Sequence, residues 1–520
     1  MHWAYKMAEQ LIRNNPNRNT FVCASGISPS GSVHIGNLRE IVTTYFVVKA
    51  LRSLGKSTRF IFSWDDFDRF RKVPKNVDPS FEKYIGMPYS EIPCPYGCHN
   101  SYAEHFEREF ETSLEAFGMD PEFIYQSHEY KSTRYNHQIQ HALKNRKIIY
   151  DILMEYKTAI ASEEERDSFY PINVYCEVCK KDSTWITSLE EEIGTLTYTC
   201  ECGHEDTLPV LQATNIKLTW KVDWPMRWLA EEVVFEPGGR DHSSETGSYN
   251  VSREISIKIF NNPPPAYEPY EFINIKGSQA KMSSSSGHNL TPGQLIKIYK
   301  PENVLFLFAK YQPSASFHMG LDEDVLRNYS EYERFRKNIQ SKSLNNDLKV
   351  SLELSMVDDE EPNTPNFNQV ASLLPLVNFD VELLRDALAR IGENYSLEQL
   401  VDISNRAEYW IKNWHPPKMI ELNKRQDIEF FETQSTLEKD WLMELCNLLR
   451  NAEGLSGDEL MKKVFAIGHD EDNKTMRNNQ KRLFSLVYKL VLNSSNGPRL
   501  PLLVEVVGRK QLLGLLDFRT

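Results

Sequence analysis

This sequence lacks an excess of positive charge. Its 60 lysines and arginines stand against 73 aspartates and glutamates, which leaves a formal net charge of −13 over 520 residues. This balance excludes attraction of the whole chain to nucleic acid, so contact with a phosphate backbone would need a local basic surface. The sequence contains no run of about 18 apolar residues, so we expect no membrane span. The first residues lack an apolar segment followed by a cleavage site, so we expect no signal peptide and a cytoplasmic protein.

Cysteine is sparse as well. The chain has eight cysteines, too few for a disulfide framework at this length. Six of them fall in two clusters, which favours metal binding in a reducing compartment. Hydrophobic residues make up 40% of the chain, enough to build packed cores. The length predicts about three or four domains.

The first clear pattern is a β–α–β unit. Residues 20–26 are a short apolar run that ends in glycine, residues 35–54 have helical periodicity, and residues 58–64 are again apolar. A strand, a glycine-rich turn, a helix and a second strand predict a parallel sheet with a site at the carboxyl ends of its strands.

The start of this helix can bind a nucleotide. His34 and Asn37 lie three residues apart in the first turn, so both face the same side and can donate hydrogen bonds to phosphate. A helix N-terminus favours anions, and Gly36 leaves room for adenine. Taken alone, the pattern is equally typical of an ordinary turn with an exposed histidine.

A serine-rich loop follows much later in the chain. It begins with Lys281 and contains Ser283 and Ser284. A lysine on such a loop can stabilise the charge that develops as pyrophosphate leaves a nucleotide. Taken alone, the stretch is more typical of a flexible linker.

Together, the two motifs resemble the HIGH and KMSKS signatures of class I aminoacyl-tRNA synthetases; they read HIGN and KMSSS here. The second signature lacks its second lysine, so the charge would rest on Lys281, with Lys276 nearby in the sequence. Four stretches, GISPSGSVHIGNLRE, SWDDFDRFRKVP, WKVDWPMRW and GGRDHSSETGSY, resemble the class I lysyl-tRNA synthetase family of archaea and spirochaetes. The resemblance covers residues 20–287.

The resemblance implies a fold and an activity. The fold is α/β: a Rossmann-type parallel-sheet catalytic domain, an inserted zinc-containing connective domain and an all-α C-terminal anticodon-binding domain. The activity is that of a lysine–tRNA ligase, with lysine, ATP accompanied by Mg²⁺, and tRNA(Lys) as substrates. His34, Asn37 and Lys281 would be catalytic, and Gly36, Ser283 and Ser284 would join them around ATP. We expect a monomer that contacts no membrane.

The expected domain boundaries follow the two motifs and the cysteine clusters. They are 1–88 for the first half of the catalytic domain, 89–212 for the connective domain, 213–290 for the second half, 291–350 for linking helices and 351–520 for the helical anticodon-binding domain.

Three alternatives stay open from the sequence. The first is another class I synthetase, for glutamate or arginine. The second is a nucleotidyltransferase that acts without tRNA, which the long helical C-terminal region disfavours. The third is a zinc-ribbon RNA-binding protein with an inactive catalytic domain, which the intact His34 and Lys281 disfavour.

Lysine as a substrate needs aromatic walls for its stem and oxygen atoms for its ammonium group. Trp220 and Asp223 offer this combination in WKVDWPMRW, and His242 and Tyr270 follow later. A tryptophan-rich core helix is an equally good explanation of each tryptophan singly. The resemblance adds Gly26 and Ser28 to the amino-acid pocket.

The cysteine clusters predict zinc. The pairs Cys176/Cys179 and Cys200/Cys202 are separated as in a zinc ribbon, and four thiolates suit tetrahedral zinc with a structural role. His204 could replace Cys202 as a ligand.

A second, looser set contains two cysteines and two histidines: Cys94, Cys98, His99 and His105. Two free cysteines beside surface histidines are the ordinary alternative. The resemblance favours a second zinc site.

The last third of the chain has helical periodicity. Between Lys474 and Lys510 basic residues far outnumber acidic ones, which suits a phosphate backbone or an ordinary solvated helix face. Trp410 and Trp414 could stack on unpaired bases, although core packing is more usual. Elsewhere we expect helices over 224–235 and 248–260, strands over 270–277 and 500–508, and a linker over 357–369.

Overall fold

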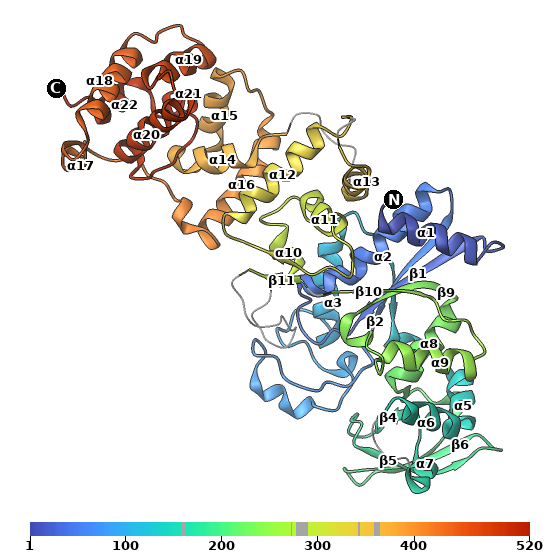
Figure 1. Ribbon diagram of the computed structural model, residues 1–520. Helices are drawn as coiled ribbons and strands as arrows, with labels where there is room; N and C mark the ends of the chain where they lie inside the picture. Colours follow the sequence, from blue (N-terminus) through green and yellow to red (C-terminus); the bar gives the residue numbers. More distant parts are fainter. Residues whose placement is uncertain (158–161, 272, 277–289, 342–343, 358–363, 520) are drawn as a thin grey trace. The chain divides into compact units, whose positions relative to one another are not determined.

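The computed structural model describes residues 1–157, 162–271, 273–276, 290–341, 344–357 and 364–519 (Figure 1). The chain forms two compact units. The first consists of Met1–Ile296, Lys300–Met319 and Arg334–Asp358, and the second of Lys297–Tyr299, Gly320–Glu333 and Asp359–Thr520. Among the described helices, none has the length and apolar character that a membrane crossing requires.

A five-stranded parallel sheet forms the centre of the first unit. Its strand order is β10-β9-β1-β2-β3. The order reverses beside β1, as in a Rossmann fold, so the predicted α/β class is confirmed. The strands are β1 Thr20–Ile27, β2 Ser57–Trp64, β3 Glu122–Tyr125, β9 Val233–Gly239 and β10 Ala266–Tyr270.

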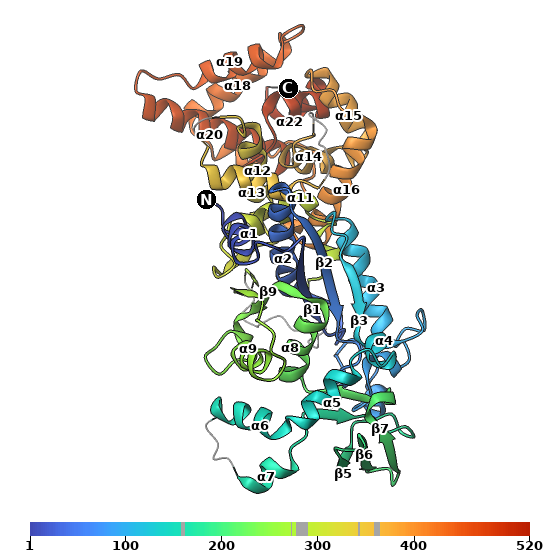
Figure 2. The same cartoon turned by 90° about the vertical axis from the view of Figure 1, so that its right-hand side faces the viewer.

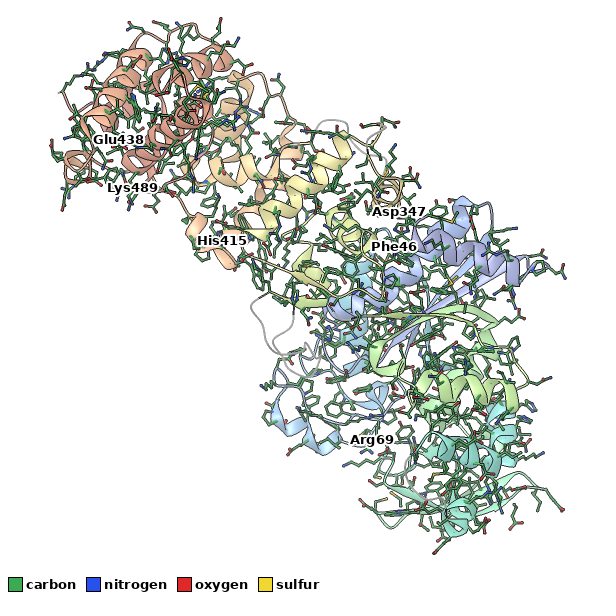
Figure 3. The ribbon with its side chains drawn as sticks, viewed as in Figure 1. Phe46, Arg69, Asp347, His415, Glu438 and Lys489 are labelled. Atoms are coloured by element: carbon green, nitrogen blue, oxygen red, sulfur yellow. The ribbon has the colours of Figure 1, made fainter. Side chains whose placement is uncertain are left out.

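The predicted β–α–β unit is confirmed. The helix between β1 and β2 is α2 (Ile35–Ser53), and most of its side chains are buried. Helix α1 (Trp3–Asn14) packs on α2, with the rings of Trp3 and Phe46 6.2 Å apart; Figure 3 labels Phe46. Because α2 is covered on several sides, it holds its first turn rigidly at the carboxyl end of β1.

The expected helix over 224–235 is wrong in its last four residues. Helix α8 (Trp220–Glu231) ends where Glu232 adopts a left-handed conformation, with φ 54° and ψ 42°, and β9 begins directly after it. The residues that continue the apolar pattern of the helix therefore form a central strand of the sheet. Helix α9 (Ser248–Lys258) is confirmed and packs against α8.

The expected strand over 270–277 is also wrong as one element. Strand β10 ends at Tyr270, and a separate strand β11 (Ile273–Ile275) pairs in parallel with β12 (Phe317–Met319). Three short helices complete the first unit: α10 Pro292–Leu295, α11 Pro301–Ala309 and α13 Asn346–Ser355. Helix α12 (Asp324–Lys337) lies mostly in the second unit.

The segment between β2 and α8 contributes β3 to the main sheet and otherwise builds a core that it shares with α8 and α9. Figure 2 shows its small sheets at one end of the first unit. They are the pair β4 Ile172–Val174 with β8 Ile216–Leu218 and the antiparallel β5 Thr184–Glu190, β6 Thr195–Cys200 and β7 Glu205–Pro209. Its helices are α3 Tyr102–Glu115, α4 Gln126–Lys131, α5 Asn136–Lys144, α6 Arg146–Glu155 and α7 Glu163–Ser168.

The second unit is helical throughout its described residues, as the periodicity predicts. The expected strand over 500–508 is wrong, because Leu500–Val507 form helix α21, which begins with Pro501 in its first turn. Figure 3 labels Glu438 on α18 and Lys489 on α20. The helices are α14 Phe367–Leu373, α15 Val381–Arg390, α16 Leu397–Asn413, α17 Ile428–Glu432, α18 Thr436–Arg450, α19 Gly457–Ile467, α20 Asn473–Leu492, α21 Leu500–Val507 and α22 Arg509–Leu516.

Candidate active site

A narrow pocket lies at the carboxyl ends of β1 and β9, where the strand order of the sheet reverses. This is the position at which parallel α/β sheets bind ligands. Its volume is about 50 Å³, enough for about four water-sized groups in a row. The residues that line it include Gly26, Glu40, Trp220, Trp224 and Glu236. A slender chain therefore fits this pocket better than a bulky ring.

Glu40 reaches the pocket from α2. Its Oε1 accepts a hydrogen bond from the Gly26 backbone N–H at 2.9 Å, and its Oε2 accepts one from the Tyr270 hydroxyl at 2.7 Å. Burial raises the pKa of Glu40 to about 8. Both donors are neutral, and no described cation forms an ion pair with Glu40.

Glu236 reaches the pocket from β9. Its Oε2 accepts a hydrogen bond from the indole Nε1–H of Trp228 at 2.7 Å. Burial raises the pKa of Glu236 to about 7. Within the described part of the chain it too has no ion-pair partner. Two carboxyl groups without a protein counter-ion thus face one narrow space, and a cationic ligand is what would stabilise their ionised forms.

Aromatic rings form the wall beside these carboxyl groups. The indoles of Trp220 and Trp224 stack with centroids 5.0 Å apart and planes at 20°. The imidazole of His242 lies 5.9 Å from the ring of Trp224. Flat apolar faces of this kind pack well against a methylene chain.

Asp223 belongs to a buried charge network outside the pocket lining. Its carboxylate pairs with Arg227 and, at 3.1 Å, with Lys217, and it accepts a hydrogen bond from Tyr130. Burial raises the pKa of Asp223, but Arg227 and Lys217 lower it by more, to below its ordinary value. Asp223 is also fully buried. The sequence predicts it to bind lysine, but two protein cations already neutralise its charge.

The network continues on both sides of Asp223. Arg227 contacts Asp65, with Nη1 and Oδ1 2.6 Å apart, and Lys217 contacts Asp68 at 2.7 Å. The Ser28 hydroxyl lies 3.4 Å from Asp68. Asp65 and Arg227 also line the pocket, so the network forms part of its wall.

The other predicted lysine-binding residues are brought together. Gly26, Trp220 and His242 line the pocket, and Tyr270 contacts it through Glu40. Ser28 lies outside the lining, next to the charge network. A Cβ atom at Gly26 would lie 2.8 Å from the Ser63 carbonyl oxygen, so close approach of β1 to β2 requires glycine there.

The first turn of α2 carries the residues predicted to bind ATP. His34 is the N-cap, and its Nδ1 accepts a hydrogen bond from the Gly36 N–H at 3.1 Å, which leaves Nε2 to carry the ring proton. The Ile35 N–H donates to the Leu290 carbonyl, and those of Asn37 and Leu38 donate to the His34 carbonyl. These backbone donors of the turn are therefore occupied and are not free to bind the anion that a helix N-terminus favours.

Asn37 offers a side chain instead. Its Oδ1 is buried and has no hydrogen-bond partner among the described residues. An amide at this position can accept a hydrogen bond from a ribose hydroxyl or, turned over, donate one to phosphate. The predicted residues Lys281, Ser283 and Ser284 lie outside the described residues, so the structure gives them no position.

The first cysteine cluster converges on one point. The sulfur atoms of Cys176 and Cys202 are 3.6 Å apart and those of Cys179 and Cys200 3.5 Å apart, and all four lie within 4.8 Å of one another. Tetrahedral zinc with Zn–S bonds of about 2.3 Å requires sulfur atoms about 3.8 Å apart. The geometry therefore fits a metal and not a disulfide. His204 is not part of the set.

The second cluster also converges. Cys98 Sγ lies 3.8 Å from Cys94 Sγ, 3.1 Å from His99 Nδ1 and 3.2 Å from His105 Nδ1. Two thiolates and two imidazoles are a common donor set for a tetrahedral metal. Both clusters could hold a metal ion.

Sequence reasoning missed the carboxyl groups of the pocket. Glu40 lies six residues after His34 in a helix whose other side chains are mostly apolar, and Glu236 interrupts the apolar run of β9. An acid within a buried strand is the signal that could have found Glu236. Glu40 carries no comparable signal, because an acid in a helix is usually exposed.

Comparison with known proteins gives a consistent result. Residues 1–358 match the family described as tRNA synthetases class I (K). A protein of Treponema pallidum named lysine–tRNA ligase is 35% identical to the chain and covers 99% of it, with 98% of that protein aligned. Proteins of the same name from Borreliella burgdorferi and Pyrococcus furiosus are 33% and 34% identical, each over 98% of the chain and 97% and 98% of their own lengths.

Proposed function

The chain belongs to the class I (K) tRNA synthetases, and we propose that it activates lysine with ATP and transfers the lysyl group to the 3′ end of tRNA(Lys). The relatives that carry the name lysine–tRNA ligase align over nearly the whole chain, which supports this assignment. They disfavour the two synthetase alternatives and the nucleotidyltransferase.

The observation that carries the proposal is the pair Glu40 and Glu236 beside the stacked indoles of Trp220 and Trp224. The ε-ammonium group of lysine would donate hydrogen bonds to the two carboxylates, and its methylene stem would lie along the indole faces. His242 would contact the substrate from the outer end of the wall. Ser28 and Asp223 would support the pocket through the charge network.

The reaction proceeds in two steps. A lysine carboxylate oxygen attacks the α-phosphorus of ATP, the bond to the β-phosphate oxygen breaks, and pyrophosphate leaves with the electron pair. A ribose hydroxyl of the terminal tRNA nucleotide then attacks the carbonyl carbon of lysyl-adenylate, and AMP leaves. The chain needs no nucleophile of its own, because orientation and charge stabilisation provide the catalysis.

The ATP side of the site lies at the start of α2. His34 would donate from Nε2 and Asn37 from its amide to phosphate oxygens, while Gly36 leaves room for adenine. Lys281, with Ser283 and Ser284, would stabilise the charge on the departing pyrophosphate. Mg²⁺ bound to ATP would neutralise further phosphate charge.

Both metal clusters would hold structural zinc. Cys176, Cys179, Cys200 and Cys202 would join the loop before β5 to the hairpin of β6 and β7. Cys94, Cys98, His99 and His105 would fix the loop before α3. Neither set borders the pocket, so neither metal would take part in the reaction.

The organisation of the chain follows from these roles. Residues 1–88 and 213–290 would form the catalytic domain, and the inserted residues 89–212 would guide the acceptor end of tRNA. Residues 291–350 would link the catalytic domain to residues 351–520, which would bind the anticodon. The pocket is built by one chain, so a monomer suffices. Translation uses charged tRNA in the cytoplasm, where we place this activity.

The charge of the pocket distinguishes lysine from the alternatives. A glutamate side chain would be repelled by Glu40 and Glu236. A guanidinium is planar and wider than an ammonium group, and the narrow pocket fits it poorly.

Charging of total tRNA with each of the twenty amino acids tests the proposal. Lysine should be the amino acid that the protein attaches, and the label should be lost when tRNA(Lys) is depleted from the pool. Attachment of glutamate or arginine in its place, or of no amino acid at all, would refute the proposal.

A further inference from the structure

A second recess lies in the helical unit, between α19, α20 and the start of α21. Its volume is about 550 Å³, which is in the usual range for ligand sites. Eight residues line it: Asp458, Met461, Lys462, Phe465, Phe484, Tyr488, Arg499 and Leu500. No part of the activation chemistry proposed above uses this recess.

Aromatic rings form the floor of the recess. Phe465 is 42% exposed, and its ring lies 5.8 Å from that of Phe484 at an angle of 74°. Tyr488 lies beneath, 6.3 Å from Phe484, and is fixed by a hydrogen bond from its hydroxyl to the Pro498 carbonyl at 2.6 Å. A flat ligand could therefore stack on Phe484 while it meets the edge of Phe465.

Charged groups surround the floor. Lys462, Arg499 and Asp458 are exposed, and no described residue forms an ion pair with any of them. On α20, Arg477 and Lys481 precede Phe484 by seven and three residues, so they extend the same face toward the start of the helix. The site combines an aromatic floor with cations at its rim, which suits a ligand with flat rings and negative charges.

Single-stranded nucleic acid has this chemistry, because bases stack on aromatic side chains while phosphates contact lysine and arginine. Of the two tryptophans that the sequence offered for stacking, Trp410 is fully buried, with its Nε1–H donating to the Leu321 carbonyl, and Trp414 is half-buried. The exposed Phe465 is therefore the better candidate.

We propose that this recess binds one unpaired base of the tRNA anticodon, with the base against Phe484 and Phe465 and the adjoining phosphates on Lys462 and Arg499. The proposal rests on the proposed function, which supplies tRNA(Lys) as the RNA. The base is uracil, because lysine codons begin with two adenines and their anticodons contain two uracils that pair with them.

Asp458 fits the edge of uracil. A uracil presents one N–H between two carbonyl oxygens, so a carboxylate can accept a hydrogen bond from the N–H. A cytosine presents an unprotonated ring nitrogen at the same place, which a carboxylate repels. Asp458 would thus contribute to specificity and Phe465 to affinity.

The test combines protein and tRNA variants. Phe465→Ala is compared with Met443→Ala on α18, whose side chain is also 42% exposed, in aminoacylation of tRNA(Lys) and of transcripts in which each anticodon base is replaced by cytosine in turn. Phe465→Ala should lower kcat/KM about tenfold or more on tRNA(Lys), in line with the loss of one stacked base. On the transcript that lacks the bound uracil it should lower kcat/KM no further. Met443→Ala should behave like the unsubstituted protein.

Asp458→Asn tests the base edge. This variant should reduce the preference for uracil over cytosine at the same anticodon position by about tenfold, because an amide can donate to the cytosine nitrogen. Equal losses for Phe465→Ala and Met443→Ala, or a Phe465→Ala loss that persists on all three substituted transcripts, would overturn the proposal. Lysine binding measured by calorimetry should be unchanged in all variants, and a protein that fails to charge lysine at all would refute the proposed function instead.

Discussion

The hydroxyl of Tyr270, at the end of β10, donates a hydrogen bond to Glu40 Oε2 on α2 over 2.7 Å. The contact joins two elements that flank the pocket and points the carboxyl group inward. Because Tyr270 supplies a hydrogen bond but no charge, the acid stays available for a cation. Lysine binding should therefore depend on whether Glu40 is protonated or ionised.

The first prediction is that lysine binding strengthens as the pH rises. Glu40 and Glu236, with pKa values raised by burial to about 8 and about 7, bind protons that the ammonium group must displace. Ionisation of Glu40 alone should lower the lysine KM at least about tenfold between pH 6 and pH 8. Glu40→Gln should raise the KM and flatten its pH dependence, while the ATP KM serves as the control. A lysine KM that is constant over this range would contradict the assignment.

The second prediction concerns stability without substrate. The pKa of Glu40 is higher in the folded protein than in the unfolded chain, so its neutral form stabilises the fold fully below about pH 4.5 and this contribution is lost as the pH rises through about 8. Glu40→Gln should therefore raise the melting temperature at pH 8.5 and change it little at pH 5. Thermal unfolding across this range checks the sign; a lower melting temperature at pH 8.5 would argue against it.

The third prediction separates Asp223 from His242. Asp223→Asn leaves Lys217 and Arg227 buried without their shared carboxylate, so it should cost about 3–5 kcal/mol of unfolding free energy. His242→Ala should leave stability nearly unchanged and raise the lysine KM about tenfold, as expected for one lost contact to a charged ligand. Urea unfolding and steady-state kinetics of both variants give the comparison. Equal effects of the two on KM alone would place Asp223 in the pocket after all.

The fourth prediction concerns metal content. The purified protein should contain about two zinc ions per chain, one in each cluster. Cys176→Ser and Cys98→Ser should each lose about one equivalent, and the double variant both. Elemental analysis measures this directly. If Cys98→Ser retains the zinc content of the unsubstituted protein, the second cluster is not a zinc site.

The fifth prediction concerns the serine-rich loop. Lys281→Ala should slow adenylate formation by about 2–4 kcal/mol of transition-state stabilisation, with little effect on lysine affinity. Single-turnover activation measures the first quantity and calorimetry the second. Lys276→Ala is the comparison, because it tests whether a neighbouring lysine shares the work. If the Lys281→Ala variant forms adenylate at the normal rate, Lys281 does not stabilise the departing pyrophosphate.

The sequence was sufficient for the parts of the fold that rest on local patterns. The β–α–β unit and the cysteine cluster could be predicted because glycine, helical periodicity and ligand spacing leave a direct signal. The boundary between α8 and β9 could not, because Glu232 takes the left-handed conformation that glycine usually signals. Helix α21 was misread because its valines favour strands, although Pro501 at its start is typical of a helix.

The pocket was only half predictable for a different reason. Trp220 and His242 belong to distinctive stretches, whereas Glu40 and Glu236 come together only when β1 pairs with β9. Similarly, Asp223 looked available until Lys217, six residues earlier, proved to be buried beside it. Pairing of this kind depends on the sheet and has no local signature.

The pairing of β1 with β9 also orders events during synthesis of the chain. Val22 of β1 lies beside Val233 of β9, so the ribosome must make about 200 further residues before this edge of β1 gains its partner. At about 5–20 residues per second, an apolar strand edge stays uncovered for about 10–40 s. All eight predicted metal ligands emerge within that interval, and a small core between Phe70 and Phe106 lies wholly within the segment that carries them. This part of the segment can therefore fold while the edge of β1 still lacks its partner and is open to aggregation.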